Sequence, residues 1–357
     1  MKALVLLLIL LADGKPPTTP VSRELVAIRK QAVGELAKLQ TAMLKKGCRP
    51  EAADAEAIVA KLMAPTEAKL DKEPVGVLPS ETVYEEVLKS WSEAGTSLST
   101  IYRNGASRLQ GKEREEAEFF AGWLATFPDL ANGIRHLNRR RKFSKLPPVT
   151  QDWSGSIGAY YHGIYLKLNP GVKGLAVHRE EPDSPGWTPE GAKAAGAILG
   201  WTGSAEAMID MWLNSRFHRN PVLNPACARV TLGGRPGGIY SCRSMNGASR
   251  LRAPDFIIWP GDGDTGIPTS FGGELPNPFP QGMTSSGTVI SIASTRRLPD
   301  GLVYRLLDAE MKPVETVTLD KRPLCFVAKS ALFGGTKYTV EVRGPKDFKL
   351  TFSFTTR

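Results

Sequence analysis

The chain has 357 residues, of which 41% are hydrophobic and 23% are charged, and this balance excludes a polypeptide that is disordered throughout. Its four cysteines are too few for a small scaffold held together by disulfides, and at roughly 100–200 residues per domain the length predicts two or three domains. The net charge of +10 favours anionic surfaces but does not identify a partner.

The first twelve residues have the composition of an export signal. Lys2 precedes an unbroken apolar run from Ala3 to Ala12, and polar residues and prolines follow it. A helix needs about 20 residues to cross a bilayer, so this run is too short for a span but matches the apolar core of a secretory signal. We therefore expect residues 1–12 to be a signal peptide, and the mature protein to be secreted, periplasmic or at the cell surface. The alternative is a buried N-terminal segment. No later segment has the length and apolarity of a membrane span.

Residues 21–127 show the periodicity of amphipathic helices. Six apolar residues recur at steps of three and four, which places them on one face of a helix: Leu25, Ile28, Ala32, Leu36, Leu39 and Met43. Further helices are expected at 51–63, from the capping residue Ser80 to about Tyr102, and at 112–124. This segment contains no histidine and no group of residues typical of a nucleophile. We predict a helical domain that packs against the rest of the chain, with a coiled-coil oligomerisation arm as the alternative.

Rare side chains gather between residues 128 and 260, where all four histidines and five of the seven tryptophans lie. Within this segment, Ala228–Leu232 and Gly238–Cys242 are two short runs joined by a glycine-rich turn, which predicts a β-hairpin. Cys227 and Cys242 flank that hairpin and are candidates for a disulfide in an oxidising compartment. A register offset of about two residues argues against direct opposition of the two thiols.

Two charged stretches have alternative interpretations. Arg139–Lys142 is a basic helix end, and cations there suit the helix dipole and solvent better than they indicate a polyanion site. Asp262–Gly266 is similar to the start of a calcium loop, but its proline-rich surroundings favour turns.

Residues 282–357 alternate in short runs that predict a small β-sandwich. The runs are Val289–Ile292, Val303–Leu306, Val314–Leu319, Tyr338–Val342 and Phe348–Phe354. Residues 332–342 and 350–356 resemble the closing strands of bacterial immunoglobulin-like modules. Tyr338 is a candidate for the corner tyrosine of such a module.

A series of motifs runs in order through the central segment. They are Leu137-Asn138-xx-Arg141 with Leu146-Pro147-Pro148-Val149, His162-xx-Tyr165-Leu166, His178-x-Glu180, Thr188-x-Glu190-Gly191 and Trp212-xx-Ser215-xx-His218-Arg219. This series resembles the bacterial branch of the CAP superfamily, the cysteine-rich secretory, antigen-five and pathogenesis-related proteins. The resemblance covers roughly residues 128–260, with a Pro/Gly-rich tail to residue 280, and it implies an α-β-α sandwich.

The resemblance also implies a cleft in which two histidines and two acidic residues converge. His162 matches the helical histidine of that set and His218 matches the second. Glu190 is the best match to the loop glutamate, and Glu180 is its competitor. Ser215 stands where many eukaryotic members have a glutamate, which puts the full set of four in doubt.

Two imidazoles and a carboxylate can serve as zinc ligands or as a general acid and base, so a divalent metal such as zinc at His162 and His218 is one prediction. The alternative is that each histidine is packed and structural. The chain has no G-x-S-x-G, H-E-x-x-H or G-x-x-x-x-G-K-[ST] motif. We therefore expect non-enzymatic binding of an extracellular lipid, glycan or protein, and not of nucleic acid.

Two alternatives remain open. One is a metal- or His/Glu-dependent hydrolase that acts on peptide or cell-wall polymer, and the other is a structural cell-surface protein. The predicted fold class is α+β and multidomain. It comprises an all-α segment at 21–127, an α-β-α sandwich with its tail at 128–280, and an all-β immunoglobulin-like sandwich at 282–357.

Overall fold

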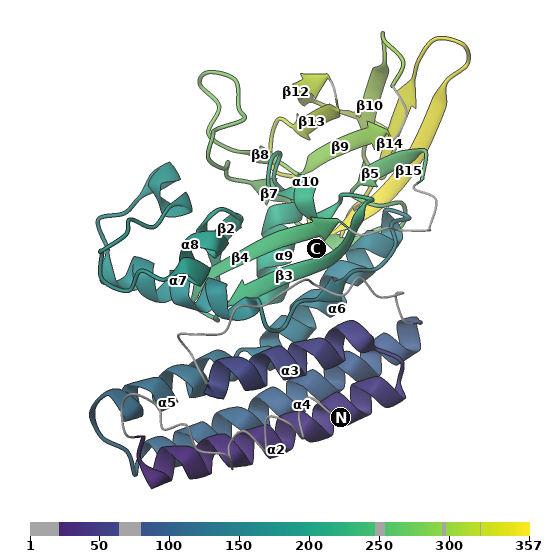
Figure 1. Cartoon of the computed structure of the whole chain (residues 1–357). Coiled ribbons are helices and arrows are strands. Elements are labelled where there is room, and N and C mark those ends of the chain that lie inside the picture. The colour runs from purple at the N-terminus through teal and green to yellow at the C-terminus, as the bar shows by residue number, and fades with distance from the viewer. Residues whose placement is uncertain (1–20, 64–79, 247–253, 295–297, 322) are drawn as a thin grey trace.

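The computed structural model describes residues 21–63, 80–246, 254–294, 298–321 and 323–357. Helices occupy most of the first half of the chain, and strands occupy most of the second half (Figure 1). The predicted mixture of helix and sheet, in that order, is therefore confirmed. The predicted signal at residues 1–12 lies outside the described residues.

Among the described residues of the N-terminal part there are four helices, close to their predicted positions: α2 (Arg23–Lys45), α3 (Arg49–Met63), α4 (Glu81–Ala106) and α5 (Gly111–Leu124). The apolar stripe of α2 is buried from Leu25 to Met43. Ser80 caps α4 as predicted, because its Oγ accepts a hydrogen bond from the backbone N–H of Val83. The helices form because each has one apolar face that can be buried against its neighbours.

The N-terminal helices pack directly on the central segment through aromatic side chains. Trp91 of α4 stacks on Trp153, with ring centroids 5.0 Å apart. Trp123 of α5 donates its indole N–H to the Oγ of Ser156 at 3.0 Å. These side chains belong to one continuous hydrophobic core. The apolar faces of α4 and α5 therefore contribute to a core shared with the central segment.

The central segment alternates helices with the strands of one sheet. Its elements are α6 (Phe127–Phe143), β1 (Thr150–Gln151), α7 (Ser156–Leu168), η1 (Gly174–His178), α8 (Pro189–Ala195), β2 (Ile198–Thr202), α9 (Ala205–Leu213), α10 (Arg219–Val222), β3 (Cys227–Gly234) and β4 (Gly238–Asn246). The strand order is β1-β3-β4-β2. β3 and β4 form the predicted hairpin.

Helices cover both faces of this sheet. Successive residues of a strand point to opposite faces, so Leu232 and Gly233 of β3 mark the two sides. Leu232 faces Gly133 of α6, since a Cβ added to that glycine would meet the leucine side chain at 3.0 Å. A Cβ on Gly233 would instead come within 2.6 Å of Ala159 of α7. The sheet therefore lies between α7 on one side and α6 with α9 on the other.

Two larger sheets form most of the C-terminal part, with strand orders β11-β10-β14-β15-β6 and β12-β13-β9-β5, and β7 and β8 form a small two-stranded sheet beside them. Tyr304 of the first sheet stacks on Phe326 of the second at 4.0 Å, so the sheets pack face to face. The hydroxyl of Tyr338, the predicted corner tyrosine, accepts the backbone N–H of Phe333 at 3.0 Å. The strands are β5 (Phe256–Trp259), β6 (Asp264–Ile267), β7 (Ser270–Phe271), β8 (Ser286–Gly287), β9 (Val289–Ser294), β10 (Val303–Leu307), β11 (Pro313–Val314), β12 (Thr316–Lys321), β13 (Leu324–Ala328), β14 (Lys337–Arg343) and β15 (Lys349–Thr356).

The C-terminal sheets begin earlier in the chain than residue 282. β5 pairs with β9, and β6 runs parallel to β15. Part of the segment assigned from sequence to the central tail thus supplies edge strands to both C-terminal sheets. β5 and β6 lie there because each forms backbone hydrogen bonds with the edge strand of a C-terminal sheet, whose N–H and C=O groups would otherwise be unpaired.

Cys227 and Cys242 do not form the predicted disulfide. Both are free and buried. Cys242 stands opposite Leu232 across the hairpin, whereas Cys227 stands opposite Asn246. At about 3.3 Å per residue, this offset places the two Cα atoms well beyond the roughly 7 Å limit for a disulfide.

Thiol titration checks this assignment. All four cysteines are buried and unbonded, and burial raises the pKa of the Cys48 thiol to about 11. We expect the native protein to react very slowly with Ellman's reagent, and the unfolded, unreduced protein to release four equivalents. Only two equivalents after unfolding would contradict the assignment of free thiols.

A buried carboxylate makes stability depend on pH. Glu51 of α3 is buried, and neither carboxylate oxygen has a hydrogen-bond partner among the described residues. Burial raises its pKa above 4.5, against the opposing effect of Arg229. Stability is therefore lost as pH rises above 4.5 through the folded-state pKa. We expect Glu51→Gln to raise the free energy of unfolding by about 1–3 kcal/mol at pH 7.5.

In urea unfolding this gain shrinks toward pH 4, where the wild-type carboxyl is protonated. Glu56→Gln, on the exposed side of the same helix, is the matched control and should change little at either pH. A gain for Glu51→Gln that is equal at both pH values would contradict the assignment.

Candidate functional site

His162 is sealed inside the central segment. It projects from α7, its exposed fraction is 0%, and its Nδ1 lies 2.8 Å from Oε1 of Glu180. The second oxygen of Glu180 accepts the backbone N–H of Thr188 at 3.3 Å. Gly191 packs so closely on this carboxylate that a Cβ there would come within 2.5 Å of it. The pair fastens the loop before α8 to α7 and does not face an open groove.

Glu190 lies elsewhere, at the start of α8. Its side chain is partly exposed, and its Oε1 is 3.6 Å from Nζ of Lys61 on α3. It lines a separate pocket between α3 and the central sheet. Glu190 therefore does not join either histidine that the sequence predicted to be its neighbour.

His218, at the N-terminus of α10, belongs to a compact polar cluster with Ser215 and Glu274. Nδ1 of His218 lies 2.6 Å from Oε2 of Glu274 and 3.2 Å from Oγ of Ser215. The Ser215 hydroxyl donates to the same Oε2 at 2.8 Å and accepts the backbone N–H of His218 at 3.0 Å. With the carboxylate at Nδ1, the neutral imidazole has its proton there, and Nε2 is left as an acceptor.

The structure does not bring His162 and His218 together, which corrects the predicted common cleft. α7 carries His162 on the Gly233 face of the sheet, while α10 packs with α9 and α6 on the other side, where Arg141 of α6 donates to the carbonyl of Val222. His162 lies on a helix, as its match to the helical histidine implied, and His218 caps the short α10, but the two helices lie on opposite faces of the sheet.

Glu274 is the functional residue that the sequence analysis missed. Its carboxylate also accepts the backbone N–H groups of Arg216 and Phe217, the latter at 3.0 Å. Burial alone would raise its pKa, but the hydrogen bonds from His218, Ser215 and Phe217 outweigh burial and lower it. The sequence contains only a weak indication of this residue, because Glu274 is a single acidic residue that follows Gly272-Gly273 in a proline-rich tail.

An open groove of about 620 Å³ runs along edge strand β2 and α9, and His218 and Glu274 line it. His178 lines the same groove, and its Nδ1 is 3.1 Å from the carbonyl of Ala195. Four exposed apolar side chains border these polar groups: Leu175, Trp201, Met211 and Leu275. The groove therefore combines fixed imidazoles and a carboxylate with apolar surface.

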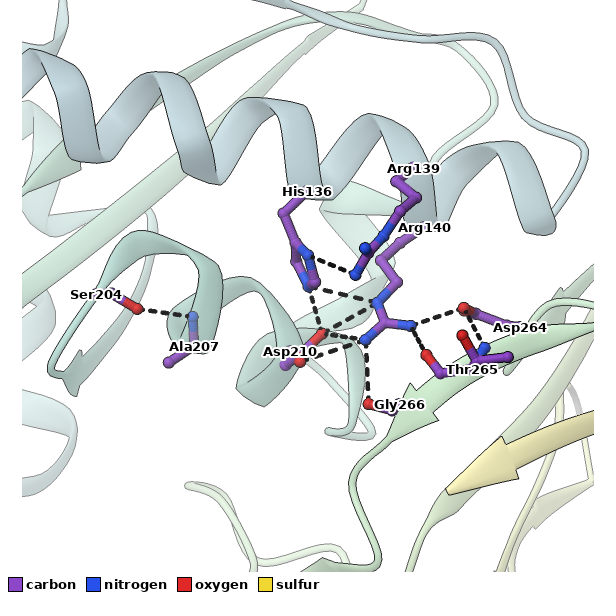
Figure 2. A network of polar contacts seen from close by, with 9 residues as sticks. All are labelled: His136, Arg139, Arg140, Ser204, Ala207, Asp210, Asp264, Thr265 and Gly266. Atoms are coloured by element: carbon purple, nitrogen blue, oxygen red, sulfur yellow. Dashed lines mark hydrogen bonds and ion pairs between the residues drawn. The ribbon is translucent and has the colours of Figure 1, made fainter. Parts of the chain in front are cut away.

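Asp210 also lines the groove and is held from behind by α6. Its Oδ1 lies 2.7 Å from Nε2 of His136, and Arg140 donates to both of its oxygens (Figure 2). Burial would raise the pKa of Asp210, but the bonds from His136 and Arg140 together lower it. Arg140 continues to Asp264 of β6 at 2.7 Å. Asp210, which forms the charged wall of the groove, is thus connected to α6 and, through Arg140, to β6.

The basic helix end is only half solvated: Arg139 and Lys142 are exposed as the sequence predicted, but the two residues between them are not. Arg140 and Arg141 are both fully buried, because acceptors far along the chain surround their guanidinium groups. Arg141 donates to the carbonyls of Pro147, Val222 and Asn224.

The predicted zinc pair does not fit the geometry. His162 is enclosed with Glu180, and His218 is in the groove, so the two do not form one donor set. Among residues that the structure describes, no three or more His, Cys, Asp or Glu side chains are grouped closely enough to hold a metal ion. We therefore derive no chemical step from a metal at that pair.

Comparison with known proteins gives no family: no protein-family model matches the chain, and no curated protein matches its sequence. Across the described helices, none is long and apolar enough to cross a membrane.

Removing the charge of Glu274 tests the cluster. Its lowered pKa means that it adds stability above pH 4.5, and that this stability is lost as pH falls through the folded-state pKa. We expect Glu274→Gln to lower the free energy of unfolding by about 1–3 kcal/mol at pH 7.

The difference should decrease in acid, as measured by urea unfolding at several pH values. Glu181→Gln, an exposed partner of Arg179, serves as control and should cost much less. Equal costs for the two variants would argue against a buried, ionised Glu274.

Proposed function

We propose that this protein is a secreted, CAP-like binding protein, and that the groove around His218 binds an amphipathic extracellular ligand such as a lipid. The single observation that carries the proposal is the composition of the groove. Exposed apolar side chains, with Trp201 at 53% exposure, stand beside a fixed polar cluster of His218 and Glu274. Exposed apolar surface next to convergent polar groups is the usual character of a small-molecule site.

The polar cluster supports binding more than nucleophilic chemistry. A serine nucleophile needs a base that accepts its proton. The proton of Ser215 is directed to Glu274, whose lowered pKa makes it a weak base. Glu274 and Ser215 also both lie at Nδ1 of His218, whereas a relay would place them at opposite ring nitrogens.

The same arrangement defines what the ligand must offer. The bond from Nδ1 to Glu274 fixes the ring of His218, so that Nε2 can accept a hydrogen bond from a ligand hydroxyl or amide. The carboxylates of Asp210 and Glu274 disfavour a phosphate backbone in the groove. An apolar ligand body would lie against Trp201 and Met211.

The alternative function is a His/Glu-dependent or metal-dependent hydrolase. The observation in its favour is that His178 and His218 line one groove, each with Nδ1 held by an oxygen, as in many metal-binding histidines. Elemental analysis of the purified chain, with turnover of peptide and cell-wall substrates by wild type and His218→Ala, tests it. Bound metal together with turnover that is lost in the variant would favour the hydrolase over the binding protein.

Loss of an aromatic side chain tests the binding function. With N-phenyl-1-naphthylamine as an uncharged fluorescent apolar probe, we expect saturable binding to the full chain and displacement by monolaurin below its micelle concentration. Trp201→Ala should weaken the probe at least about ten-fold, or about 1.4 kcal/mol.

Trp187→Ala is the matched control, since this tryptophan is 37% exposed and does not line the groove. It should leave affinity within about two-fold of wild type. Equal weakening by both substitutions, or no displacement by the lipid, would contradict the proposal.

A further inference from the structure

A second pocket, of about 450 Å³, lies away from the groove, where α3 covers the central sheet. One face of α3 forms a wall through Asp54 and Lys61, and α8 forms another through Glu190 and Lys193. The strands β3 and β4 form the remaining wall. Its volume is that of a small-molecule site.

Alternation along the two strands makes the sheet face in this pocket polar. Val230 and Leu232 of β3 point into the apolar core. The intervening Thr231 stands opposite Arg243 of β4, and both line the pocket. Arg229 and Ser241 continue the same polar face. A sheet face covered by a helix is ordinarily apolar, so four polar side chains beneath α3 are unexpected if their role is packing alone.

Two acidic side chains of the pocket, Asp54 of α3 and Asp152 just after β1, already have partners. Both oxygens of Asp54 accept from Arg229 at 2.7 Å, and one also accepts the backbone N–H of Trp153. Asp152 accepts from Ser154, from the backbone N–H of Gly155 and from the hydroxyl of Thr231. Arg229 is the cation nearest to both carboxylates, at 2.7 Å from Asp54 and 3.6 Å from Asp152, so neither pairs with Lys61, Lys193 or Arg243.

The other cations of the pocket have N–H groups that make no short hydrogen bond to the described protein. The side chain of Lys61 is only 7% exposed, yet its one ion pair in the described structure, with Glu190, is 3.6 Å long. Lys193 and Arg243 line the same pocket and make no hydrogen bond or ion pair with any residue that the structure describes. Burying an ammonium group is costly unless a nearby anion compensates for the lost hydration. The pocket thus combines one buried cation, Lys61, with two exposed cations, Lys193 and Arg243, that have no protein partner among the described residues.

We propose that this pocket binds a small organic anion bearing a carboxylate or phosphate group. The anionic group would lie between Lys61, Lys193 and Arg243. The guanidinium of Arg243 offers paired donors that match either group, and the two lysines add charge-assisted hydrogen bonds. The bound anion would join α3 to the sheet and so stabilise the contact between the helical and central segments. This site does not depend on the function proposed for the groove.

Titration of the full chain tests the proposal. Citrate and inorganic phosphate are the two probes, measured by isothermal titration calorimetry at constant ionic strength in sodium chloride, with glycerol as a neutral comparison. We expect saturable binding of at least one anion and none of glycerol, and a melting temperature that rises with the concentration of the bound anion. Binding of citrate alone would assign a carboxylate ligand, and binding of phosphate alone a phosphate ligand.

Substitutions locate the binding. Arg243→Gln and Lys193→Gln, both of exposed residues, should each weaken the anion at least about ten-fold, while Arg305→Gln on β10 leaves it unchanged. Lys61→Met adds a third test where it folds. Trp201→Ala should leave anion binding intact, which separates this site from the groove. No saturable binding, or equal binding by wild type, Arg243→Gln and Lys193→Gln, would overturn the proposal.

Discussion

The buried guanidinium of Arg140 is the interaction on which the groove depends. Its side chain is 2% exposed and it pairs with Asp210 at 3.0 Å and with Asp264 at 2.7 Å. A buried cation is tolerated only when acceptors surround it, so α6, α9 and β6 must assemble together around this side chain. Figure 2 shows the three elements meeting at that point. Asp210 and the segment that follows β6 line the groove. The shape of this wall therefore depends on Arg140, which is buried and does not line the groove itself.

The position of Glu274 follows from the same constraint. β6 is fixed by Asp264 at one end and by pairing with β15 along its length, and the chain then passes β7 before it reaches Glu274. The carboxylate is thereby delivered to the backbone N–H groups before α10. Those donors, with Ser215 and His218, keep it ionised despite burial. The polar cluster of the groove is therefore assembled from two segments that meet because both pack against the C-terminal strands.

How much was predictable from sequence depended on how local each determinant was. The helices and the hairpin were predicted because their apolar periods and turn residues lie within a few positions of one another. Arg140 was expected in solvent because its partner Asp264 is 124 positions away. His162 shows a different limit: the motif located the helix, but the same residue types also form the buried pair with Glu180. A motif specifies which residues are near one another in the chain, and not which face of a sheet their helix covers.

The central sheet explains how one small domain can offer two chemically different hollows. Residues that alternate along β3 divide between the apolar core around Leu232 and the polar face that carries Thr231 and Arg229. The polar face is covered by α3 and collects cations, whereas the groove at the edge strand β2 has carboxylates and exposed Trp201. Four cations and three carboxylates line the first, whereas Asp210, Glu274 and Arg357 line the second. The two hollows therefore differ in charge and in apolar surface, although both lie against the same sheet.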